Sequence, residues 1–107
     1  TRSAFLQKEL TLRQRLIDTD TEVRRKRIEL SSAREQLDHA RKALTLSEEA
    51  HRLAEELYAE GVADALSVLD AQTALFNAQI ALARAKTGYA YAYLALELAL
   101  GEFPPEG

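Results

Sequence analysis

Two histidines and one basic run are the residues whose types and spacing could do chemistry. His39 and His51 stand 12 residues apart, without a partner histidine four residues away or a Glu-x-x-His pair. This spacing predicts no metal site. The run Arg24-Arg25-Lys26-Arg27 is the candidate for phosphate or nucleic-acid contact. However, Asp20 and Glu22 stand four positions before Arg24 and Lys26, and Glu29 stands four positions after Arg25. Such spacing is typical of an ordinary salt-bridged helix surface.

No other set of residues predicts catalysis. The chain has no cysteine, which excludes thiol catalysis, disulfides and cysteine-ligated metals. The sequence also lacks a glycine-rich phosphate loop, a Ser-His-Asp set and carboxylates paired in a pocket. A net charge of −3 does not indicate the basic surface that nucleic-acid-binding proteins have. We therefore expect neither an enzyme nor a metal or cofactor site.

The composition predicts long helices. Of 107 residues, 47% are hydrophobic and 29% are charged, and glycine and proline are scarce, a mix typical of coiled coils. No apolar run approaches the ~20 residues of a membrane-spanning helix. Gly61 can end a helix in the left-handed conformation, and Asp64 can cap the next helix. We expect a helix over residues 1–58, a hairpin turn over 59–63, a helix over 64–101 and a tail over 102–107.

Heptad rows predict how the two helices pack. Large apolar residues recur every seven positions along both helices, and small residues follow three positions later. His51 and Tyr58 continue the first row, and Lys26 opposite Leu96 breaks the pattern. If the chain folds back at Gly61, large side chains face small ones, which fills an antiparallel seam. The expected pairs are Leu44 with Ala78, Leu37 with Ala85, Leu30 with Ala92, Ala54 with Val68, Ser47 with Leu75, Ala40 with Leu82 and Ala33 with Tyr89.

Two apolar surfaces have no partner in such a hairpin. Residues 3–21 extend beyond the second helix, and they carry large apolar side chains. We expect them to be helical, and either to pack on another chain or to be poorly ordered where no partner is present. The second helix has another apolar face, and a helix with two apolar faces needs two neighbours. We interpret the chain as one element in a wall of helices, in which each helix contacts neighbours on both sides. The alternative is a two-helix coiled coil that self-associates. The second face consists of Leu69, Phe76, Ala83 and Ala90, flanked by Ile80 and Leu94.

The turn and the second helix resemble TolC-type outer-membrane efflux proteins. The run Tyr58-Ala59-Glu60-Gly61, followed by Val68-Leu69-Asp70-Ala71-Gln72, resembles the family's Y-x-x-G turn and its V-L-D-A-Q-like segment. The likeness continues to Leu100-Gly101, whereas residues 1–45 match only as a long heptad helix. The family's β-strands, equatorial segments and signal peptide are lacking here. We therefore expect one α-hairpin of a larger protomer.

The resemblance implies a passive conduit of a tripartite export pump. In this family three protomers form a β-barrel in the outer membrane and a helical tube across the periplasm. The hairpin tips meet those of a periplasmic adaptor protein, and the inner-membrane pump is an indirect partner. The tip that would dock the adaptor comprises Tyr58, Glu60, Gly61 and Val62. Asp70 and Ser67 match the pore-entrance positions, although Ser67 is not acidic, and Ala63 stands where some members have a tip arginine.

Two other functions remain open from the sequence. The chain could be the α-hairpin of a periplasmic adaptor (membrane fusion) protein, although it lacks the arginine–leucine–serine tip pattern of those hairpins. It could also be a structural coiled-coil interaction module of unrelated origin. Asp70 also has a simpler interpretation than a pore-entrance residue. It can be a solvated carboxylate in the first turns of the second helix, where the helix dipole stabilises a negative charge. Flanking amphipathic strands and a second Y-x-x-G hairpin would decide for the duct.

Overall fold

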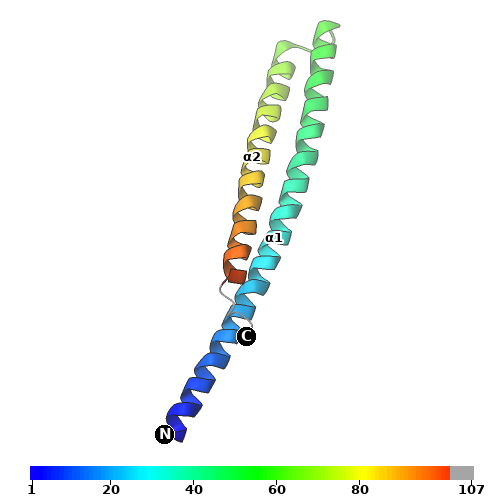
Figure 1. The fold of residues 1–107 in the computed structure, drawn as a ribbon. Helices are drawn as coiled ribbons and strands as arrows, with labels where there is room; N and C mark the ends of the chain where they lie inside the picture. Colours follow the sequence, from blue (N-terminus) through cyan, green and yellow to red (C-terminus); the bar gives the residue numbers. More distant parts are fainter. Residues whose placement is uncertain (102–107) are drawn as a thin grey trace. The chain divides into compact units, whose positions relative to one another are not determined.

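The computed structural model describes residues 1–101, and both elements in this range are α-helices. Helix α1 runs Arg2–Ala59 and helix α2 runs Ala65–Gly101. Within residues 33–89 the two helices lie side by side, and the chain runs toward the turn along α1 and away from it along α2 (Figure 1). The predicted all-α antiparallel hairpin is therefore confirmed. The expected tail over residues 102–107 lies outside the described residues.

Residues 33–89 form one compact unit, which contains the turn. Its interior is a single seam between the two helices, in which Leu37 is 8% exposed. The predicted seam positions of this unit are buried or half-buried, with one exception. Tyr58 is 53% exposed although it continues the heptad row, because α2 begins only after the turn, while Leu57 takes the half-buried place. The burial supports the predicted seam, and the pairing of individual residues stays a prediction.

Residues 1–32 and 90–101 belong to a second compact unit. Its buried side chains are Val23, Ala92 and Ala99. Lys26, which breaks the apolar pattern, has a side chain only 24% exposed, and its Nζ lies 3.4 Å from Glu29 Oε2 and 3.8 Å from Glu22 Oε1. A lysine is tolerated here because its stem can cover apolar surface while its ammonium group is paired with carboxylates.

Large apolar side chains are exposed at both predicted unpartnered surfaces. Residues 3–21 are helical, as predicted, and Phe5 is 68% and Leu10 63% exposed. On α2, Leu69 and Phe76 are 56% and 61% exposed. Ile80 differs from the prediction, because it is half-buried and so belongs to the flank of the seam. Within residues 1–101, most of this apolar surface therefore lacks a covering element.

Candidate functional site at the helix turn

The turn is closed by backbone hydrogen bonds at the end of α1. The N–H of Val62 donates to the carbonyl of Leu57 at 2.8 Å, and the N–H of Gly61 donates to the carbonyl of Tyr58 at 3.0 Å. Together with a φ of 81° at Gly61, these bonds form a Schellman motif. The Leu57 carbonyl also accepts the N–H of Ala63 at 3.1 Å. Glycine is required here because other residues rarely adopt a positive φ.

Helix α2 begins with a side-chain cap. Oδ1 of Asp64 accepts the backbone N–H and the hydroxyl of Ser67, each at 2.9 Å. The predicted N-cap is thus confirmed. These hydrogen bonds, the backbone one first, lower the pKa of Asp64. The hydroxyl of Ser67, which the resemblance placed at a pore entrance, is therefore used in the cap.

Three side chains of the predicted tip face solvent around this hydrogen-bonded turn. Tyr58 is 53% and Val62 72% exposed, and Glu60 is exposed as well. A Cβ built on Gly61 would meet no atom within 4 Å. The turn therefore holds an aromatic ring, a carboxylate and an apolar group on a short, hydrogen-bonded stretch of chain.

Asp70 lies on α2, a little more than one turn beyond its first residue, and it is exposed. No ion pair joins Asp70 to another residue of the described chain. No group of three His, Cys, Asp or Glu residues that could hold a metal ion occurs within residues 1–101. The structure thus places Asp70 on the solvated surface of the second helix, near its start.

The histidines and the basic run lie on the surface or the seam of α1. Nε2 of His51 is buried without a hydrogen bond, 3.2 Å from Oε1 of Glu55. Arg24 pairs with Asp20 at 3.2 Å, as predicted. Arg25 pairs with Glu22 at 2.7 Å and not with Glu29. Lys26 lies 3.8 Å from Glu22, as predicted, and 3.4 Å from Glu29. The basic run is thus largely neutralised by α1 itself.

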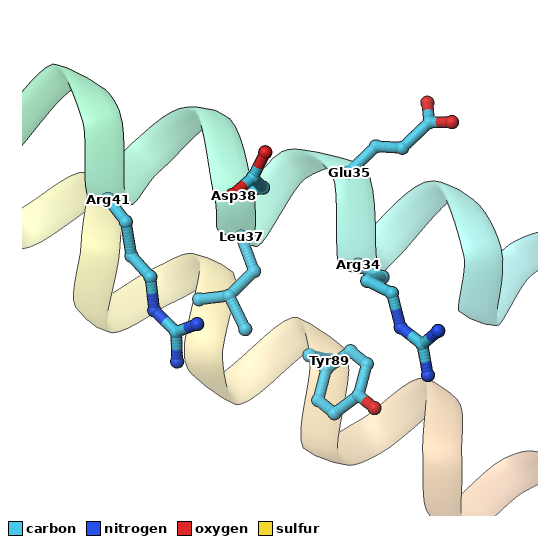
Figure 2. A pocket seen from close by; sticks show the side chains of 6 residues that line it. All are labelled: Arg34, Glu35, Leu37, Asp38, Arg41 and Tyr89. Atoms are coloured by element: carbon cyan, nitrogen blue, oxygen red, sulfur yellow. The ribbon is translucent and has the colours of Figure 1, made fainter.

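One surface feature of residues 33–89 was missed by the sequence analysis. Arg34 and Arg41 of α1 and Tyr89 of α2 line a hollow of about 530 Å³, together with Glu35, Leu37 and Asp38. Figure 2 shows both arginines extending from α1 toward α2, with Tyr89 between them. The signal that could have revealed it is the spacing of the two arginines, seven residues apart on one face of the helix.

The comparison with protein families identifies the chain. The family described as outer membrane efflux protein matches residues 1–102. The chain belongs to the outer membrane efflux protein family. The match extends over the first 45 residues, where the sequence resemblance rested only on heptads. No curated protein and no solved structure matched the chain.

Membership in the outer membrane efflux protein family confirms the TolC-type resemblance. The family consists of transport conduits rather than enzymes, and it implies an oligomeric duct that works with adaptor proteins. Within residues 1–101, neither helix has a stretch long and apolar enough to cross a membrane.

Proposed function

We propose that this chain is the periplasmic helical hairpin of an outer-membrane efflux duct. The hairpin forms part of the tunnel wall, three protomers complete the tube, and substrates pass through without chemical change. The observation that carries the proposal is the exposed, hydrogen-bonded turn in a chain whose family is that of efflux ducts. The family match also favours the duct over an adaptor hairpin and over an unrelated coiled coil.

The wall function accounts for the exposed apolar faces. Phe76 and Leu69 on α2, and Phe5 and Leu10 on α1, are all more than half exposed in the single chain. A helix with apolar character on two faces is stable between two neighbours. Neighbouring hairpins in a tube would supply these contacts on both sides.

The tip is the part of the hairpin that docks the adaptor. Tyr58 and Val62 offer apolar contact area, and Glu60 offers a charge beside them. The Schellman bonds hold these side chains at a sharp reversal, so little conformational entropy is lost when a partner hairpin binds. This docking would couple the duct to the adaptor and, through it, to the inner-membrane pump.

A substitution at Gly61 tests the docking role in the complete protein. Gly61→Val should distort the turn, because valine resists a positive φ, and it should impair export and adaptor cross-linking without preventing trimer assembly. The matched control is Gly88→Val, since Gly88 lies inside α2 with no atom within 4 Å of a Cβ built there. Unchanged export and adaptor cross-linking in Gly61→Val would refute the docking role.

Asp70 and Ser67 are proposed to line the entrance of the tube. Three copies of the Asp70 carboxylate in a narrow aqueous lumen would attract cations and repel one another. Asp70→Asn in the complete duct should therefore weaken cation preference and block by polyvalent cations in single-channel recordings. The control is Asp18→Asn, which removes an exposed carboxylate of α1 far from the turn. Unchanged cation preference in Asp70→Asn would leave Asp70 as a solvated carboxylate at the start of α2.

A further inference from the structure

The hollow on residues 33–89 combines a cationic rim with an apolar floor. Leu37, 8% exposed, and the half-buried ring of Tyr89 form its base. The exposed guanidinium groups of Arg34 and Arg41 extend toward α2 on either side of Tyr89, whereas Glu35 points away from α2 (Figure 2). The hollow therefore presents two positive groups over apolar surface.

Half of the basic residues of α1 form an ion pair with an acidic residue three or four positions away. They are Arg13, Arg24, Arg25, Lys26, Lys42 and Arg52.

Arg34 and Arg41 make no ion pair within the described chain. Asp38 stands four positions after Arg34 and three before Arg41, but its carboxylate pairs with Lys42 at 3.1 Å. Both guanidinium groups therefore keep their donors available for an external acceptor.

The spacing of the two arginines defines what can bind both of them. Residues seven apart on a helix lie about 10.5 Å apart along its axis. A second helix running alongside would present two carboxylates at this separation if its acidic residues also stood seven positions apart. Each guanidinium fork can hold one carboxylate through two parallel hydrogen bonds. Small apolar side chains between the carboxylates would then rest on Leu37 and Tyr89.

We propose that the hollow is a docking surface for an acidic helix of a partner protein, with two carboxylates one heptad apart held by Arg34 and Arg41. Arg41 lies about 27 Å from the end of α1 at Ala59, at a rise of about 1.5 Å per residue. The surface is therefore separate from the tip, and its test does not depend on the adaptor docking proposed there.

Synthetic helices measure the binding directly. The probe is a fluorescent alanine-rich peptide with two glutamates seven residues apart, and its binding to the complete protein is followed by fluorescence anisotropy at low salt. The double substitution Arg34→Gln/Arg41→Gln should weaken binding about fivefold, the loss expected from two exposed ion pairs. Arg2→Gln, which changes an exposed arginine at the other end of α1, should leave binding unchanged. Helicity by circular dichroism should be equal in all variants.

The spacing of the peptide charges separates a fitted helix from general charge attraction. A peptide with its glutamates five residues apart places them on opposite sides of the helix, so it should bind more weakly by a similar factor. Equal binding of the two peptides, or unchanged binding to the double variant, would overturn the proposal. Displacement of the peptide by an equal concentration of inorganic phosphate would also overturn it, because the hollow would then be a general anion site.

A second copy of the chain is the remaining occupant to test. Glu48 and Glu55 of α1 also stand seven residues apart and are exposed. Sedimentation can show whether the complete protein associates beyond its own oligomer. If it does, and if Glu48→Gln/Glu55→Gln and Arg34→Gln/Arg41→Gln each abolish that association, the occupant is a second copy of the chain. The proposal of a partner helix is then wrong. Association that neither double variant changes, together with peptide binding that depends on spacing, supports the proposal.

Discussion

Replacement of Leu37 by alanine probes the seam where it is most deeply buried in residues 33–89. Leu37 is 8% exposed, and it occupies a heptad position that the sequence placed opposite a small residue of α2. The side chain also forms part of the floor of the arginine-lined hollow. The substitution therefore removes apolar contact from the seam and leaves a gap that adjoins solvent.

The expected cost follows from the atoms removed and from the place of the gap. Leucine to alanine removes three carbon atoms, and each buried methylene-sized group contributes about 0.8 kcal/mol. Buried leucine-to-alanine changes cost about 2–5 kcal/mol, and the upper part of that range comes from sealed cavities. Because the gap at Leu37 opens into the hollow, water can enter it. We expect a loss of about 2–3 kcal/mol in the free energy of unfolding.

Circular dichroism at a fixed chain concentration measures this loss. A destabilisation of 1 kcal/mol lowers Tm by about 4–8 °C in a domain of 60–100 residues, so Leu37→Ala should lower Tm by at least about 8 °C. The matched control is Leu46→Ala on the same helix, where the leucine is 71% exposed; that change should cost less than about 0.5 kcal/mol. Equal melting curves for the two variants would refute the assignment of Leu37 to the seam.

Three further predictions concern the cap, Gly88 of α2 and assembly. Asp64→Ala should lower Tm more than Asp64→Asn, because asparagine can still accept the N–H of Ser67. Since the pKa of Asp64 is lowered from 3.8, its stabilisation is fully present above that value and is lost as pH falls through the lowered pKa; acid melts of Asp64→Ala should lack this contribution. Gly88→Ala should raise the free energy of unfolding by about 0.5–1 kcal/mol, since a Cβ at Gly88 meets no atom within 4 Å, and urea denaturation showing no gain would contradict this. Sedimentation of the chain should show association that rises with concentration and is weakened by Phe76→Glu, because Phe76 is 61% exposed.

The hairpin could be predicted from the sequence because local rules determine it. Gly61 is the single glycine of the first 87 residues, and its positive φ ends α1 where the pattern predicted a stop. The carboxylate of Asp64 needs only a neighbour three residues later, so its cap is readable from the sequence. The heptad rows likewise indicated which residues face the seam.

Features that depend on three-dimensional competition could not be predicted. The heptad pattern predicted that Tyr58 continues the buried row, because periodicity in one helix does not show where the partner helix ends. The partner of Arg25 was also misjudged, since Glu22 and Glu29 both stand within reach and Lys26 competes for them. The hollow was missed for a similar reason. Its arginines are available because Asp38 pairs with Lys42, and sequence spacing alone allows all three pairings.

The distribution of burial links the fold of this chain to its proposed role. The buried side chains of the described residues are Val23, Leu37, Ala92 and Ala99, two of them in each helix and three of them in the unit of residues 1–32 and 90–101. A helix gains most of its stability in a protein from packing of its apolar face. Because Phe5, Leu10 and Phe76 leave such faces exposed, much of the packing available to α1 and α2 has to come from neighbours. In a tube wall these neighbours are further hairpins, so the contacts that stabilise each helix are also the contacts that close the conduit.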